Sequence, residues 1–314
     1  MKRKRAWNAN GDKTGGGTVP LLHMNGVETH YHLQGRGRTV VFLHPPCMGS
    51  RVFTYMRNDL ARDHRVLTFD FRGHGRSASS GEELTIPVLA EDIRLLMDEL
   101  DLHQAYLVSY SLASMVALEA MLVYPDRIRG AALLSGMAEV SDRRSRLEAM
   151  AKKIAAAFMA KELIALTGSW KHADNAEAFY RLRTETKAGD PEKWKEYLAA
   201  CLDYRATDRL SRIEKPALLL FGENDRKYAP YARQFRQVLR RASTAWIPLA
   251  DDRLPIHSAD ASSQLIRGWI AAIEERPRAA ARIKTNEFRY ESYGLSYDPD
   301  LALDDQDSTF KDYR

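Results

Sequence analysis

The fold is decided by the stretch Leu107-Val108-Ser109-Tyr110-Ser111-Leu112-Ala113, which joins an apolar run directly to a helical pattern. A serine between a buried strand and a helix is the setting of a nucleophile elbow, usually written G-x-S-x-G. The turn is sharp, so small residues are needed two before and two after the serine, and here they are Ser109 and Ala113. Ser111 is therefore the candidate nucleophile; the alternative is an ordinary serine at a helix N-cap.

Short apolar runs like the one before this serine recur along the chain. Each is bounded by turn residues, which is typical of a strand buried on both faces of a parallel sheet. The runs cover residues 39–43, 66–70, 105–108, 131–134 and 217–221. Helical patterns such as 88–100 lie between them, and Asn25-Gly26 predicts a hairpin at the start. The alternation predicts an α/β fold, a mainly parallel sheet with helices on both faces.

The alternation stops between residues 137 and 212, which carry helical patterns over 143–167, 175–187 and 192–204. An all-helical insertion in such a sheet predicts a cap over the carboxyl edge of the strands, where ligands bind. Aromatic residues are spread through it: Phe158, Trp170, Tyr180, Trp194 and Tyr197. Each one is expected to pack within the cap, and together they suggest an apolar roof over a pocket.

Four parts of the chain follow from this pattern. Residues 1–18 form a flexible basic tail, and residues 19–136 with 213–275 form the α/β core. The helical cap covers 137–212, and residues 276–314 form a C-terminal extension with an acid-rich end. The two tails are the segments that a protein partner would be expected to bind.

Composition excludes several classes of protein. The 314 residues are 45% hydrophobic and 28% charged, with net charge +5. The sequence has no run of 18 apolar residues, so we expect no transmembrane helix. No apolar stretch follows the basic residues Lys2–Arg5, so we expect no ordinary secretory signal. Two distant cysteines form no disulfide framework. We expect a cytoplasmic protein with no metal, no cofactor, no nucleic-acid partner and no membrane contact, since metal and nucleotide motifs are missing from the sequence.

Three further motifs resemble the α/β-hydrolase superfamily over roughly residues 20–275. The stretch 42–46, Phe-Leu-His-Pro-Pro, looks like the family's strand and His-Gly oxyanion loop. The stretch 70–77, Asp-Phe-Arg-Gly-His-Gly-Arg-Ser, is very similar to its D-x-R-G-x-G-x-S loop, in which His74 is expected to be a loop residue. The stretch 219–225 resembles the G-x-x-D segment that supplies the triad acid, here Asp225. The resemblance implies the AB hydrolase-1 type with a helical cap, and its order of serine, acid and histidine agrees with this chain.

Two positions depart from the family's pattern. The histidine position after the last strand holds Asp252, and the nearest histidine is His257, read either as the base or as a surface residue. A carboxylate is a weak base near neutral pH, so the identity of the base decides function. Pro46 stands where a backbone donor is expected and has no N–H.

The oxyanion donors are therefore expected to be the N–H groups of Leu112 and Cys47, with His44 bracing the loop. Two functions follow. The first is a serine hydrolase in which Ser111, Asp225 and His257 act on a small, largely apolar ester, amide, lactone or carbon–carbon-bonded ketone. The alternative is a catalytically impaired homologue that binds a small molecule or a protein. A His257 imidazole within about 2.6–3.2 Å of Ser111 Oγ would separate them.

Overall fold

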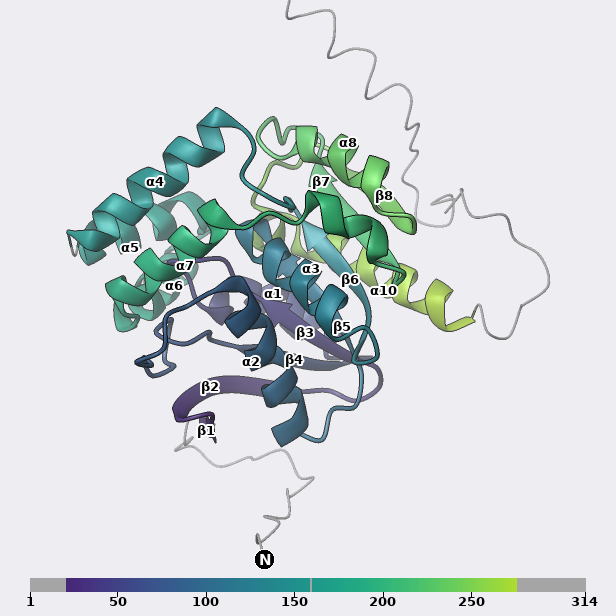
Figure 1. The fold of residues 1–314 in the computed structure, drawn as a ribbon, viewed down its shortest axis with the longest axis horizontal. Coiled ribbons are helices and arrows are strands. Elements are labelled where there is room, and N and C mark those ends of the chain that lie inside the picture. The colour runs from purple at the N-terminus through teal and green to yellow at the C-terminus, as the bar shows by residue number, and fades with distance from the viewer. Residues whose placement is uncertain (1–20, 159, 276–314) are drawn as a thin grey trace, which may run out of the picture.

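An eight-stranded sheet lies at the centre of the structure, a computed structural model that describes residues 21–158 and 160–275 (Figure 1). In sheet order the strands are β1 (Leu21–Met24), β2 (Val27–Gln34), β4 (Arg65–Phe69), β3 (Thr39–Leu43), β5 (Ala105–Tyr110), β6 (Ile128–Leu134), β7 (Ala217–Gly222) and β8 (Ala242–Ile247). Strands β1 and β2 run antiparallel to their neighbours, and all the other pairs are parallel. The predicted α/β class with a mainly parallel sheet is confirmed. The predictions for the two tails fall outside the described residues.

The opening hairpin follows from its two turn residues. Asn25 and Gly26 have φ values of 47° and 77°, both in the left-handed region. A two-residue turn of this kind matches the twist of antiparallel strands. Met24 accordingly pairs with Val27 across the turn, and the predicted hairpin is confirmed.

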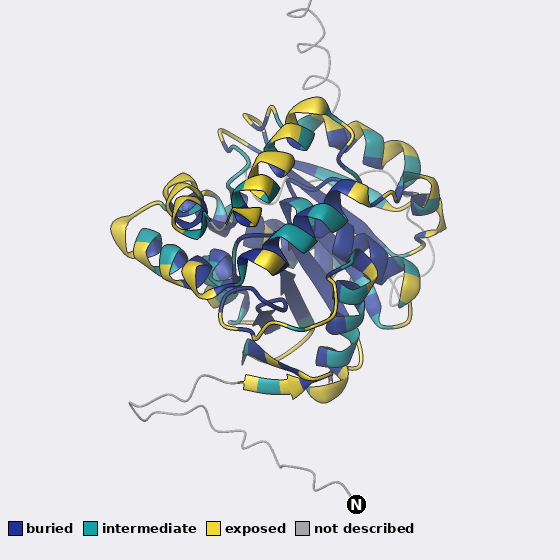
Figure 2. Ribbon diagram, turned by 60° about the vertical axis from the view of Figure 1, so that its left-hand side comes forward, coloured by how far each residue is buried: buried dark blue, intermediate teal, exposed yellow. Residues whose placement is uncertain are grey.

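Helices cover both faces of the sheet, as predicted. Residues of α2 (Ile86–Glu99), α3 (Ser114–Val123) and α8 (Ala229–Val238) share one apolar cluster with one face of the strands. Residues of α1 (Thr54–Leu60), α9 (Leu254–His257) and α10 (Ala259–Glu275) share a second cluster with the other face. Figure 2 shows the buried residues gathered on the strands and the exposed residues on the outer sides of helices. In the described part of the chain, no helix has the length and apolarity needed to cross a membrane.

Between β6 and β7 the described residues form helices and connecting loops without a strand, and helices α4 to α7 gather on one side of the molecule (Figure 1). We call this segment the helical insertion. It consists of α4 (Arg143–Ala157), α5 (Lys161–His172), α6 (Ala176–Ala188), α7 (Pro191–Asp203) and the 3₁₀ helix η3 (Thr207–Arg212). The single helix predicted over 143–167 is wrong, since the chain breaks it into α4 and α5. The break lets the α5 face that ends at His172 lie against the same cavity as α4.

The Asp70–Ser77 loop is structural. The Asp70 carboxylate accepts hydrogen bonds from Ser50 N at 2.7 Å and Arg76 N at 3.0 Å, and it lies 2.8 Å from His30 Nδ1. Burial alone would raise the pKa of Asp70, but His30 and these donors lower it to about 2. Gly75 is required here, because a Cβ would lie 2.3 Å from the Asp70 carboxylate oxygen. His74 contacts the backbone carbonyl of this loop, as expected of a loop residue.

The arginine of this loop leads to a stability prediction. Arg72 pairs through two nitrogens with Asp92, whose side chain is 1% exposed, and through a third with Glu82, which is 53% exposed. Replacing Asp92→Ala leaves a buried guanidinium half-paired, so we expect the free energy of unfolding in urea to fall by about 3–5 kcal/mol. The matched variant Glu82→Ala should lose at most about 1 kcal/mol. Equal losses in the two variants would contradict this assignment.

Candidate active site

Ser111 lies at the carboxyl end of β5, where the 3₁₀ helix η2 (Ser111–Ala113) begins. Its φ of 54° is left-handed, a conformation that costs a residue other than glycine about 1–3 kcal/mol. The neighbours Ser109 and Ala113 are completely buried, which explains why both are small. Ser114 Oγ, 2.7 Å from the carbonyl oxygen of Ser111, helps to hold the turn. These features are those of a strand–turn–helix elbow.

The elbow opens into a cavity of about 100 Å³ between the core and the helical insertion. The loop 45–48 after β3 and residues 110–112 line it from the core side. One face of α4 (residues 145, 148, 149 and 152) and one face of α5 (164, 167, 168, 171 and 172) line it from the other. This spacing is that of a single side of a helix. The insertion thus covers the cavity that Ser111 lines.

The expected aromatic roof is absent from this cavity. Its lining contains none of Phe158, Trp170, Tyr180, Trp194 and Tyr197. Trp170 is 79% exposed, whereas Trp194 and Tyr197 pack inside the structure. The insertion presents both charged residues (Glu148, Lys152 and Lys171) and apolar residues (Ala149, Ile164 and Leu198) to the cavity, so the roof is not built from the aromatic residues that were expected to form it.

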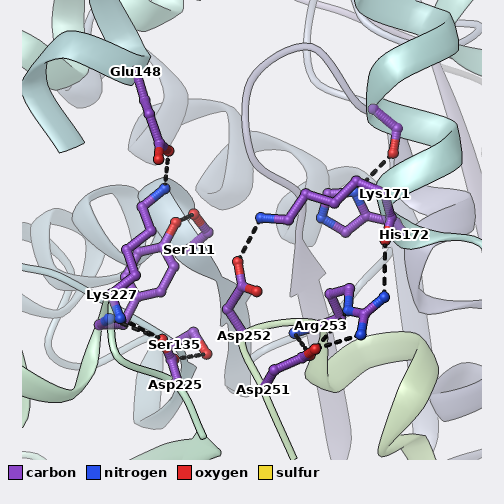
Figure 3. Close-up of polar contacts among 12 residues, drawn as sticks. Ser111, Ser135, Glu148, Lys171, His172, Asp225, Lys227, Asp251, Asp252 and Arg253 are labelled. Atoms are coloured by element: carbon purple, nitrogen blue, oxygen red, sulfur yellow. Dashed lines mark hydrogen bonds and ion pairs between the residues drawn. The ribbon is translucent and has the colours of Figure 1, made fainter. Parts of the chain in front are cut away.

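The hydroxyl of Ser111 has a tyrosine as its partner (Figure 3). Ser111 Oγ lies 2.7 Å from the Tyr228 hydroxyl, and either oxygen can donate. Burial raises the pKa of Tyr228, and the adjacent Lys227 works in the opposite sense. Lys227 Nζ lies 4.9 Å from the centre of the Tyr228 ring and forms an ion pair with Glu148 of α4. Burial alone would lower the pKa of Lys227, but Tyr228 and Glu148 outweigh it and hold that pKa above its usual value.

Asp225 follows β7 and is bonded to its own loop. Its Oδ1 accepts from Tyr228 N at 2.9 Å and from Lys227 N at 3.2 Å. Its Oδ2 accepts from the Ser135 hydroxyl at 2.9 Å. Burial raises the pKa of Asp225 to about 6, against these hydrogen bonds and with help from the charge of Asp252. Asp225 therefore fixes the backbone of Tyr228, and among residues 21–158 and 160–275 no imidazole is bonded to it.

Asp252 occupies the position at which the family's histidine is expected. It lines the cavity together with Ser111. Its Oδ2 lies 2.7 Å from Lys171 Nζ of α5, and Figure 3 shows the carboxylate turned toward that lysine. The cavity that contains Ser111 thus has a salt bridge at the sequence position where the family's imidazole is expected.

His257 is not brought to the serine, which corrects its expected role as the base. Its Nε2 lies 3.1 Å from the carbonyl oxygen of His172, and the residue lines a separate surface hollow that does not include Ser111. The physical reason is α9: its residues Leu254–Ile256 are buried, so this helical turn carries the imidazole at residue 257 outward.

The oxyanion loop after β3 carries two of the predicted residues, His44 and Cys47. His44 is buried, its Nε2 accepts from Phe71 N at 2.9 Å, and its Nδ1 lies 3.0 Å from Pro45 O. It thereby links the loops after β3 and β4. Cys47 has a φ of 62°, and burial raises the pKa of its thiol to about 12. Cys47 and Leu112 line the cavity beside Ser111.

Sequence reasoning missed several residues of this cavity. Tyr228 and Lys227 stand three and two positions after Asp225, and no motif singles them out. No motif singles out His172 either, although it lies on the helical face that lines the cavity. Burial lowers the pKa of His172 to about 4, and its ring nitrogens contact Gly168 O and the Tyr110 hydroxyl. Within the described ranges, no group of three or more His, Cys, Asp or Glu side chains is arranged to hold a metal ion.

Comparison with known proteins agrees with this architecture. The family model of the alpha/beta hydrolase fold matches residues 38–237. The chain is 23% identical to the "Putative 2-succinyl-6-hydroxy-2,4-cyclohexadiene-1-carboxylate synthase" of Bacillus subtilis, over 82% of this chain and 100% of that protein. It is 27% identical to the pimeloyl-[acyl-carrier protein] methyl ester esterase of Aeromonas hydrophila, over 70% of this chain and 85% of that protein.

A solved structure agrees at the level of the fold. The enol-lactonase of Burkholderia xenovorans superposes with a TM-score of 0.71 at 21% identity, covering 80% of this chain and 100% of that one. Hydrolase is the enzyme class that the matched family and the relatives support. The chain belongs to the alpha/beta hydrolase fold family.

Proposed function

We propose that the protein is a hydrolase that uses Ser111 as its nucleophile on a small ester, amide or lactone. The observation that carries the proposal is the serine hydroxyl in a left-handed elbow at the end of β5, opening into a cavity beneath the helical insertion. A strained conformation of this kind persists only where the surrounding structure over-determines it, and such conformations cluster at active sites. Membership of a hydrolase family supports the same reaction class.

Tyr228 is the group that takes the serine proton in this proposal, in place of His257. Its hydroxyl is within hydrogen-bond distance of Ser111 Oγ, the first requirement for a base. In its ionised form the phenolate accepts the proton while Oγ bonds to the carbonyl carbon. The same proton then passes to the leaving alcohol or amine as the tetrahedral intermediate collapses to an acyl-enzyme. Water attacks the acyl group in the reverse sequence, again with Tyr228 as base.

The neighbours of this pair support the two charges that develop. The Lys227 ammonium group beside the Tyr228 ring favours the phenolate. The N–H groups of Leu112 and Cys47 are the proposed donors to the oxyanion, and a single such donor is worth roughly 2.7–4 kcal/mol. Asp225 acts as a positioning residue, because its carboxylate holds the backbone N–H of Tyr228. The helical insertion acts as the cap that excludes bulk water.

The test is labelling by a fluorophosphonate probe followed over pH. We expect an adduct on Ser111 in wild type, located by mass spectrometry, and none in Ser111→Ala. Because the base must be ionised and burial raises the pKa of Tyr228 above its usual value, the labelling rate should rise about tenfold per pH unit through the range in which the phenol is still mostly protonated. Tyr228→Phe should be labelled about 100-fold more slowly at pH 9, since general-base catalysis is worth at least this much.

Tyr231→Phe is the matched control. Tyr231 lies in α8 and is buried like Tyr228, but its hydroxyl donates a hydrogen bond to Asp142. Its labelling should equal that of wild type. A rate that is already constant from pH 6 upward would replace Tyr228 by a carboxylate base, for which Asp252 is the candidate. A wild-type protein that is never labelled would sink the hydrolase proposal.

One observation favours a second function, that of a ligand-binding homologue without turnover. The ion pair between Lys171 and Asp252 occupies the position of the family's histidine. This function predicts that wild-type protein binds small molecules in the cavity while the fluorophosphonate leaves Ser111 unmodified.

A further inference from the structure

The cavity around Ser111 carries one lysine more than it has carboxylates. Three lysines line it, Lys152, Lys171 and Lys227, together with the carboxylates of Glu148 and Asp252. Lys227 pairs with Glu148, and Lys171 pairs with Asp252. No ion pair or hydrogen bond of Lys152 is found among the described residues. The lining therefore has one ammonium group without a counter-charge.

Lys152 is exposed to solvent and also contributes to the lining of the cavity. It stands on the α4 face that lines the cavity, one turn after Glu148 and close enough to Cys47, Lys171 and Lys227 to feel their charges. The ammonium groups of Lys227 and Lys171 lie close enough to repel that of Lys152. Three ammonium groups around one cavity, against two carboxylates, leave a net positive charge there, so a bound anion is attracted by more than a single lysine.

We propose that the cavity takes a substrate that carries a carboxylate, bound by Lys152, alongside the carbonyl group that Ser111 attacks. The inference rests on the proposed function for the reaction but not for the binding. One surplus positive charge matches a monoanion, and a free volume of about 100 Å³ suits a short organic acid better than a bulky polyanion. The substrate proposed here is therefore an anion, in place of the largely apolar substrate expected from the sequence.

Binding is tested first, with ligands that do not need turnover. Pentanoate and pentanamide have the same length and differ in charge, and calorimetry measures the affinity of each. We expect wild-type and Ser111→Ala protein to prefer pentanoate at least tenfold. Lys152→Met keeps the aliphatic stem but removes the charge, and should lose about 10- to 100-fold in pentanoate affinity, the range for a hydrogen bond to a charged group. Lys152→Arg should retain most of the preference.

Lys153→Met is the matched control, because Lys153 is the adjacent residue of α4 and does not line the cavity. Its affinity for pentanoate should equal that of wild type. Equal binding of acid and amide by wild type, or equal losses in the two methionine variants, would overturn the inference.

Hydrolysis then separates the inference from the proposed function. Mono-p-nitrophenyl glutarate carries a carboxylate, and p-nitrophenyl pentanoate is its neutral counterpart. We expect kcat/KM to favour the glutarate ester in wild type and this ratio to fall at least tenfold in Lys152→Met, with the neutral ester unaffected. Turnover of both esters without preference would contradict the carboxylate inference and leave the hydrolase function supported. Pentanoate binding without turnover of either ester would contradict the hydrolase function and leave the carboxylate inference supported.

Discussion

The Ser111→Ala protein is expected to lose all measurable ester hydrolysis while it keeps its fold and its affinity for pentanoate. The hydroxyl is the atom group that would form the acyl-enzyme, and no substitute nucleophile is poised beside it. Cys47 lines the same cavity, but burial raises the pKa of its thiol to about 12, so the reactive thiolate is scarce. The measurement is hydrolysis of p-nitrophenyl esters with calorimetric binding on the same samples.

A glycine at the same position adds a stability readout to this result. Ser111 holds a left-handed φ of 54°, which alanine does not relieve and glycine adopts without penalty. Ser111→Gly should therefore exceed Ser111→Ala by about 1 kcal/mol in free energy of unfolding in urea, with both variants inactive. This result would show that the backbone at Ser111 is strained and that the strain accompanies a hydroxyl needed for activity.

Ser109→Gly is the control for the glycine effect. Ser109 lies in β5 with ordinary strand conformation, so glycine there should lower stability by about 0.5–1 kcal/mol relative to alanine. If Ser111→Gly were less stable than Ser111→Ala, the elbow would not be strained and the observation that carries the proposed function would lose its weight.

Short-range patterns were enough to predict the core of this fold. The apolar runs identified β3 to β7 because parallel strands are buried on both faces and show no alternation. The loop 70–77 was recognisable because its geometry depends on local requirements, such as a glycine in contact with the Asp70 carboxylate. Ser111 was identified for the same reason, since a strand that turns directly into a helix is a local feature.

The partners within the cavity could not be predicted in this way, because they depend on how the insertion packs. Lys171 reaches Asp252 from 81 residues away, and Tyr228 reaches Ser111 from 117. The sequence between α4 and α5 contains no proline or glycine that would predict a break, since residues 158–160 are Phe-Met-Ala. His257 was misread because spacing in sequence does not tell on which side of α9 its ring emerges.

Replacing Asp252→His should raise the hydrolytic rate about 100-fold or more at pH 8. Asp252 lines the cavity with Ser111 and lies close enough to Asp225 for its charge to raise the pKa of that carboxyl. An imidazole in this position could be supported by Asp225 on one side and face the serine on the other. A general base of this kind contributes about 10²–10⁴-fold. The broken pair with Lys171 costs little, because that lysine is half-exposed.

The pH profile and two further variants decide whether the new histidine acts as the base. The rate of Asp252→His should rise through about pH 6.5 and then level off, as expected of an imidazole, whereas wild type should keep rising into the alkaline range. Asp252→Asn removes the same charge without supplying a base, so it should show no such gain. The double variant Asp252→His/Tyr228→Phe should keep most of the gain, because the imidazole no longer needs the phenol. If it falls back to the level of Tyr228→Phe alone, the added histidine does not reach Ser111, and the tyrosine is needed whatever stands at position 252.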